Sequence, residues 1–240
     1  MFSRCARARK TARRRRCSKE RQVANLQAEG SGLPAHELVY RRLRDKILFG
    51  ELEPGQPVTI QGLTEQLQVG MTPVREALRR LTAAGALDFQ GNRRIIVPVL
   101  DAAAIDELTI ARVALEPQLA RRAAQRCDAA GIARLGATDA RLDGAIARGD
   151  VRGYLVENHQ FHAELNAIAG APILTDLVEG LWLRFGPSLR VVCGQFGTRN
   201  LPDQHKAILA ALGARDADAA AAAMRADVEQ GMTQITEGLA

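Results

Sequence analysis

Residues 101–240 constrain the fold more strongly than any other feature, because they show helical periodicity and no convincing strand pattern. Ala and Leu recur at the three- and four-residue spacing of an amphipathic helix throughout this region. Glycine-, proline- and aspartate-containing breaks fall at 149–150, 170–172, 194–202 and 213–216. We therefore expect helices over 101–127, 129–148, 151–169, 172–194, 202–213 and 215–238. An antiparallel bundle is the natural way for these helices to bury their apolar faces.

The preceding region carries shorter elements. A helical stripe over 36–50 ends at Gly50, and "IQGLTEQLQ" (60–68) predicts a short second helix. The stretch "VGMTPVREALRRL" (69–81) predicts a third helix with Thr72 as N-cap and Pro73 at the first helical position.

This third helix has two different faces. Its predicted inward stripe consists of Val74, Ala77, Leu78 and Leu81. Thr72, Arg75 and Arg79 remain on one outer face, with Arg80 to the side. The pattern therefore predicts a helix that packs on one face and presents positive charge on the other.

Two β-prone runs, 86–90 and 93–97, follow this helix and are joined by the turn pair Gly91-Asn92. Three helices followed by a hairpin correspond to the winged helix-turn-helix plan. The sequence thus predicts a mostly α protein. We expect a basic flexible tail and lead-in (1–35), a winged helix-turn-helix domain (36–98) and an all-α antiparallel helical bundle (99–240).

Charge is concentrated at the N-terminus. Residues 1–22 contain ten Lys or Arg and one acidic residue, against a net charge of +6 for the chain. This tail is either a basic arm attracted to phosphates or an extension without a role. No apolar stretch follows it as in a signal peptide, and none has the length of a membrane span. The four cysteines form no CxxC pair, which fits a reducing cytoplasm, and we expect a cytoplasmic protein without a membrane partner.

Two long motifs carry a family resemblance. The segment "GELEPGQPVTIQGLTEQLQVGMTPVREALRRLTAAGAL" resembles the winged-helix domain of the GntR family of bacterial transcription regulators. The segments "IDELTIARVALEPQLARRAA" and "ENHQFHAELNAIAGAPIL" resemble the FCD effector domain of its FadR-like branch. The resemblance implies a homodimeric regulator, usually a repressor, that binds double-stranded operator DNA and responds to a small-molecule effector.

The third helix is then expected to enter the major groove. Arg75 and Arg79 face the duplex together, and Thr72 with the first-turn amides meets a phosphate. The predicted DNA-contacting set is completed by Arg80, by Arg93 and Arg94 of the wing, and by Arg42 of the first helix. Relatives commonly carry an arginine where this chain has Met71. The base preference of relatives is therefore not expected to transfer at that position.

The resemblance also implies a divalent metal site. Four positions match the family's ligand set of Asp, His, His and His: Asn158, His162, His205 and Asp227. Two imidazoles and a carboxylate are competent ligands for zinc, nickel, iron or manganese. The alternative is a site without metal, in which Asp227 and Asn158 satisfy the two histidines.

Arg112 and Glu116 match the family's R-x-x-x-E motif. The arginine is expected to face the effector cavity, where a carboxylate would be its partner, or to pair with Glu116 one helical turn away. Together with Arg112, the expected effector-binding residues are Asn158, His162, His205 and Trp182, although Trp182 also fits a core role.

Parts of the sequence are also compatible with two other function classes. A metal-dependent hydrolase or oxygenase would use the His162, His205 and Asp227 set. No general base, glycine-rich phosphate loop or nucleophile elbow accompanies those residues, so we do not expect an enzyme. A nonspecific nucleic-acid binder would depend on the arginine-rich tail.

Overall fold

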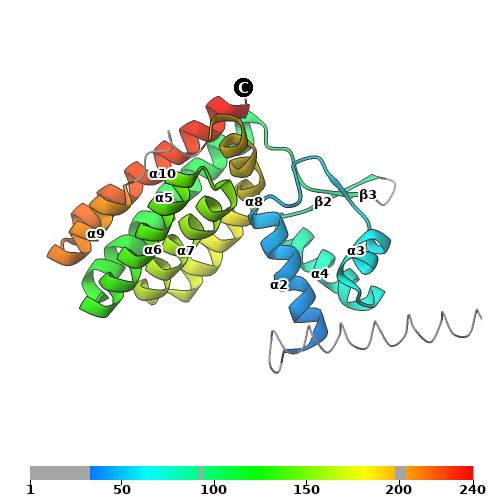
Figure 1. Cartoon of the computed structure of the whole chain (residues 1–240), viewed down its shortest axis with the longest axis horizontal. Helices are drawn as coiled ribbons and strands as arrows, with labels where there is room; N and C mark the ends of the chain where they lie inside the picture. Colours follow the sequence, from blue (N-terminus) through cyan, green and yellow to red (C-terminus); the bar gives the residue numbers. More distant parts are fainter. Residues whose placement is uncertain (1–32, 92–93, 198–203, 240) are drawn as a thin grey trace, which may run out of the picture. The chain divides into compact units, whose positions relative to one another are not determined.

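The computed structural model describes residues 33–91, 94–197 and 204–239, which fall into two compact units (Figure 1). The N-terminal unit comprises the described residues up to Asp45 together with Gln56–Ile96. The helical unit comprises Lys46–Gly55 and the described residues from Val97 onward. The expected basic tail lies outside the described residues.

The N-terminal unit contains three helices, and the predicted positions of all three are confirmed. They are α2 (Ala35–Leu48), whose last turn belongs to the helical unit, α3 (Ile60–Leu67) and α4 (Met71–Ala83). The Thr59 hydroxyl caps α3 by accepting from the Gly62 amide at 3.0 Å. The predicted inward stripe of α4 is confirmed, because Val74, Ala77, Leu78 and Leu81 are all buried.

The prediction that Thr72 caps α4 is wrong. The helix begins at Met71, and its N-cap is Gly70, which makes no side-chain cap hydrogen bond. Thr72 and Pro73 are therefore the second and third helical residues. The first four N–H groups of a helix have no partner within it, so proline is compatible with more than one first-turn position and the Thr-Pro pair does not fix the start.

A three-stranded antiparallel sheet completes the N-terminal unit. Its order is β1-β3-β2, with β1 (Pro57–Val58), β2 (Asp88–Gln90) and β3 (Arg94–Ile96). The predicted hairpin is confirmed by the pairing of Phe89 with Ile95. The strand β1 was not predicted, because two residues are too few to show an alternating pattern. The turn residues 92–93 lie outside the described residues.

The helical unit confirms the predicted helices, with ends shifted by a few residues. They are α5 (Ala102–Arg126), α6 (Ala129–Arg148), α7 (Val151–Ala169), α8 (Pro172–Phe196), α9 (His205–Ala214) and α10 (Ala217–Leu239). Aspartates cap α5, α6 and α7 by accepting from the amide three residues later. Helix α10 packs along α5, and α6 packs on α7 (Figure 1).

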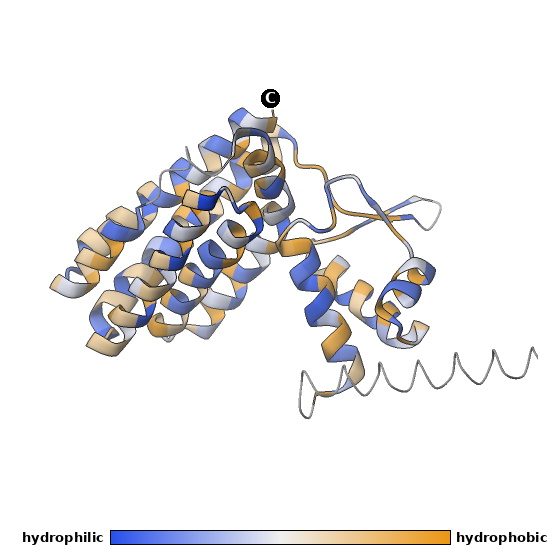
Figure 2. Cartoon of the chain, viewed as in Figure 1, coloured by the Kyte–Doolittle hydropathy of each residue, from blue (hydrophilic) through white to orange (hydrophobic). Residues whose placement is uncertain are grey.

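These helices are amphipathic, and Figure 2 shows hydrophilic and hydrophobic segments alternating along each of them. Among the helices of the described residues, none has the length and apolar character that crossing a bilayer requires. The interior of the helical unit nevertheless contains charged and titratable groups, namely Arg112, Glu116, Asp139, His159, His162 and His205. Buried charges are costly unless they are paired, so these residues mark a candidate functional region of the unit.

Candidate functional site

The solvent-facing stripe of α4 is the first candidate site. Met71, Arg75 and Arg79 are spaced four residues apart and are exposed, as is Thr72 beside them. Arg79 donates from Nε and Nη2 to the Glu76 carboxylate at 3.1 and 2.7 Å. The stripe therefore presents two cationic side chains to solvent, and the unpaired amides of the first helical turn beside it also favour anions.

The other predicted DNA-contacting residues lie in different surroundings. Arg80 donates from Nη1 to Glu37 of α2 at 2.7 Å, and its guanidinium lies 3.6 Å from the centre of the Tyr40 ring. This arginine therefore holds α4 against α2. Arg94 is exposed on β3, Arg42 is half-buried on α2, and Arg93 lies outside the described residues.

An apolar groove of about 450 Å³ runs between α4 and the sheet. Arg75, Leu78 and Arg79 line it from α4, and Phe89 and Ile95 line it from the hairpin. The solvent-facing stripe of α4 thus adjoins a groove whose opposite wall contains the exposed ring of Phe89.

The second candidate site is the buried cluster of the helical unit. His162 of α7, His205 of α9 and Asp227 of α10 each direct one ligand atom to a common point, with all three atoms within 4.8 Å of one another. His162 Nε2 lies 3.2 Å from Asp227 Oδ2, and His205 Nε2 lies 4.0 Å from Asp227 Oδ1. The structure therefore brings together three of the four residues predicted to bind metal.

Two further carboxylates lie on the Nδ1 side of the two histidine rings, away from Asp227. Glu116 Oε2 of α5 is 3.3 Å from His162 Nδ1, and Asp139 Oδ1 of α6 is 3.4 Å from His205 Nδ1. Each ring thus has a carboxylate at Nδ1 and presents Nε2 to Asp227. A carboxylate at the outer nitrogen fixes the tautomer and orientation of a metal-binding histidine.

Aromatic packing fixes the same two rings. Phe161 stacks on His205 with centroids 3.8 Å apart and planes within 10°. His162 lies 5.0 Å from Trp182, measured between ring centroids. The histidines are therefore held by both polar and apolar neighbours.

The electrostatic state of the cluster without metal follows from these contacts. Burial alone would lower the pKa of His162, but the carboxylates of Asp227 and Glu116 outweigh it and raise the pKa to about 9. Burial would raise the pKa of Asp227, but the His162 imidazolium holds it well below its usual range. His162 is thus a cation between two carboxylates near neutral pH.

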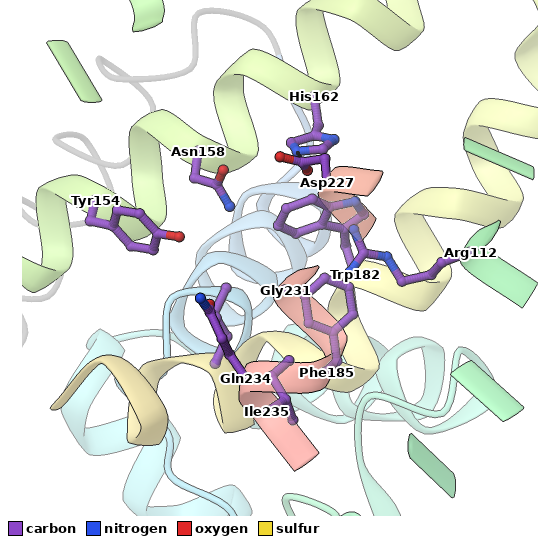
Figure 3. Close-up of a pocket in the computed structure, with 11 residues that line it drawn as sticks. Arg112, Tyr154, Asn158, His162, Trp182, Phe185, Asp227, Gly231, Gln234 and Ile235 are labelled. Atoms are coloured by element: carbon purple, nitrogen blue, oxygen red, sulfur yellow. Dashed lines mark ion pairs between the residues drawn. The ribbon is translucent and has the colours of Figure 1, made fainter. Parts of the chain in front are cut away.

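A small pocket adjoins the cluster and is lined by residues of α5, α7, α8 and α10 (Figure 3). Tyr154 and Asn158 point into it from α7, and Gln234 lines it from α10. The fourth predicted metal residue, Asn158, therefore lies in the wall that also contains His162 and Asp227. The volume of about 30 Å³ accommodates an ion with one or two waters.

Arg112 lines this pocket and is also paired with Glu116 one helical turn away, which is one of the two alternatives that the sequence offered for it. Its Nε donates to Glu116 Oε1 at 2.5 Å. Its guanidinium lies 4.2 Å from the ring centre of Phe185 and 5.0 Å from that of Trp182. Trp182 similarly combines a buried position with a place in the pocket wall.

The donor set fits a divalent transition metal. Two imidazole nitrogens and a carboxylate oxygen are the ligand types that zinc, nickel and iron accept. FCD-type domains often bind metals, and the converging His-His-Asp group found here is consistent with that property.

Sequence reasoning missed several residues of this region, among them the polar residues Asp139, Tyr154 and Gln234. Asp139 had a detectable signal, since it shares the buried stripe of α6 with Leu135, Thr138 and Leu142. A carboxylate on a core-facing stripe requires a partner. Tyr154 and Gln234 had no comparable signal, because their helices place many residues toward the interior.

Comparisons with known proteins agree with this two-part organisation. Residues 35–97 match the family described as bacterial regulatory proteins, gntR family, and residues 107–230 match the FCD domain. The transcriptional regulator McbR of Escherichia coli K12 is 30% identical over 177 residues, covering 72% of this chain and 80% of McbR. The transcriptional repressor RspR of the same organism is 28% identical over 205 residues, covering 84% of this chain and 85% of RspR.

Solved structures support the same assignment. The structure of E. coli McbR/YncC is similar with a TM-score of 0.80 at 26% identity, covering 85% of this chain and 98% of that chain. A GntR regulator from Rhodococcus sp. RHA1, at 23% identity and a TM-score of 0.69, shares the fold. The enzyme alternative finds no support in these comparisons. The chain is a GntR-family transcription regulator with an FCD effector-binding domain.

Proposed function

We propose that this chain is a homodimeric repressor that reads operator DNA through α4 and is controlled by a metal-assisted carboxylate effector in the helical unit. The observation that carries the DNA part is the exposed stripe of α4, on which Arg75 and Arg79 face solvent together. Each arginine can donate two hydrogen bonds to the O6 and N7 acceptors of a guanine in the major groove. Thr72 and the first-turn amides supply phosphate contacts, and Arg94 supplies a wing contact. Arg80 contributes indirectly, by fixing α4 on α2.

The effector part rests on the pocket beside the cluster. His162, His205 and Asp227 would hold a divalent metal, with Asn158 or water at the remaining position. When bound, the metal would supply a Lewis-acidic centre for a carboxylate. Arg112 would bind the same anion through its terminal nitrogens, since Nε already donates to Glu116.

The pocket volume of about 30 Å³ is smaller than a typical organic ligand needs. Effector binding therefore requires the pocket walls to move. Trp182 is one such wall, and its ring lies 5.2 Å from His159, which in turn lies 5.9 Å from Phe49 in the segment that follows α2. Movement of this wall would act on the segment that leads to the DNA-binding helices, and by linkage DNA would alter effector affinity equally.

The dimer rests on exposed apolar side chains of the helical unit. Ile173 and Leu177 lie one turn apart on α8 with 77% and 54% of their surface exposed, and Ile110 of α5 is 63% exposed. A second copy would bury such residues, as homodimer interfaces are more apolar than other surfaces. Two copies would present two α4 helices to the half-sites of a pseudo-palindromic operator in the cytoplasm.

The experiment is selection of duplexes from a random-sequence pool with the purified full chain, followed by anisotropy titration with and without nickel and a series of small carboxylates. We expect a pseudo-palindromic selected site and an affinity that decreases when metal and carboxylate are both present. Deletion of residues 1–30 should retain site selectivity and reduce only salt-sensitive background binding. Equal affinity for selected and scrambled duplexes would contradict the proposal.

A further inference from the structure

The solvent-facing stripe of α4, which carries Arg75 and Arg79, begins with an apolar side chain. Among the described residues of the N-terminal unit, the exposed large hydrophobic side chains are Met71 and Phe89, at 56% and 57%. Met71 is the first residue of α4 and lies on the stripe of Arg75 and Arg79. An isolated exposed methionine is common, but this one lies at the end of a helix where the bases would be read.

Met71 is not part of the core of the N-terminal unit. The core stripe of α4 is formed by other residues, and the N-cap residue before Met71 is a glycine that makes no side-chain hydrogen bond. Its thioether is flexible and polarisable, which suits contact with a partner's apolar surface. The side chain is therefore available to a ligand of this face, and the N-terminal residues of a recognition helix are those that meet base edges.

The chemistry of the side chain restricts what it can recognise. Methionine has no hydrogen-bond donor, and its sulfur is only a weak acceptor. The major groove offers one apolar feature, the C5-methyl group of thymine, while the other base-edge groups there are donors and acceptors. A guanine opposite Met71 would lose the water bound to its O6 and N7 atoms without gaining a donor.

We propose that Met71 determines operator specificity by contacting the C5-methyl group of a thymine in each half-site. The inference rests on the proposed function, in which α4 enters the major groove, and it names one base that this chain selects there. The arginines fix guanine-rich positions, and Met71 adds a thymine at the end of the site that faces the start of α4.

The test replaces each thymine of the pool-selected duplex, one at a time, with deoxyuridine, which keeps base pairing and removes only the methyl group. We expect one thymine per half-site at which this change weakens binding by about fourfold, the effect of burying one methyl group. Met71→Ala should bind the thymine and deoxyuridine duplexes equally at that position. Met71→Arg should shift the base selected there from thymine to guanine.

Phe89→Ala is the matched control, because it removes the other exposed large hydrophobic side chain among the described residues of the unit and should retain the deoxyuridine effect at the Met71 position. Met71→Ala should leave thermal unfolding unchanged, because the side chain is exposed. A selected duplex that binds tightly, yet shows no methyl effect dependent on Met71, would overturn this inference and leave the proposed function intact. A pool that yields no selected sequence would overturn both.

Discussion

The exposed face of α4 and the buried cluster of the helical unit use charge in opposite ways. The side chain of Arg79 is 72% exposed, and its pairing with Glu76 contributes little to stability because both groups remain solvated. The side chains of Glu116 and His162 are 0% and 2% exposed, and each contacts a group of opposite charge. Exposed charges are available to a partner such as DNA, whereas buried charges must first be satisfied by one another.

This difference predicts how each region responds to substitution. An exposed arginine can be removed at little cost, because a partner that it leaves behind, such as Glu76, remains solvated. Removal of one buried charge leaves its partner uncompensated, so conservative replacements are needed to separate function from folding.

Asp227→Asn should weaken zinc or nickel binding by more than about a hundredfold. The free energy of metal binding at such sites is roughly 10 kcal/mol or more and comes from only a few ligands, so each ligand contributes a large part of it. The measurement is competition with a chromophoric chelator, with circular dichroism to verify folding. Asp143→Asn is the matched control, since Asp143 is an exposed carboxylate of α6 that bonds Lys206. Unchanged metal affinity in Asp227→Asn would show that Asp227 is not a metal ligand.

Asp139→Asn tests the group behind His205. We expect metal affinity to fall by about tenfold to a hundredfold, the usual effect of losing an outer carboxylate that orients a histidine ligand. The same chelator competition measures it, and Asp143→Asn again serves as the control. A purely structural Asp139 would change the unfolding temperature while metal affinity stayed at the wild-type value.

The pH dependence should have opposite signs for metal binding and for stability. Metal must displace the proton of His162, whose pKa is raised to about 9, so affinity should rise by up to about tenfold per pH unit toward pH 9. The raised pKa stabilises the metal-free fold below the unfolded value of 6.5, and this contribution is lost as pH rises through 9.

Calorimetry of nickel binding in buffers of different ionisation enthalpy counts the protons released, and urea unfolding measures the stability. His162→Gln should remove both dependences. Metal affinity that is flat between pH 7 and 9 would show that His162 carries no displaceable proton.

Arg75→Ala should weaken binding to the selected duplex by about tenfold at fixed salt, more than a generic phosphate contact contributes. Arg225→Ala is the matched control, because it removes an exposed helical arginine from the helical unit. Gel-shift titration measures both variants, and thermal unfolding should be unchanged in each. Equal operator affinity of Arg75→Ala and wild type would exclude Arg75 from base reading.

Much of the fold was predictable because its signals are local. Helical periodicity and glycine breaks located α5 to α10, and the turn pair with its two β-prone runs located the hairpin. Local signals were insufficient at the start of α4, where Thr72 resembles a cap but Gly70 is the cap. They were also insufficient for β1, whose pairing with β3 joins residues far apart in the chain.

The sequence alone determined the periodicity of the helices, the placement of Arg75 and Arg79 on one face of α4, and the placement of Asn158 and His162 on one face of α7. These relations follow from spacing within a single helix, which is fixed by backbone geometry. Only the tertiary structure decided that Glu116 and Asp139 lie behind the two histidines, and that Arg80 is engaged by Glu37. Such contacts join separate helices, and their distances depend on how the helices pack.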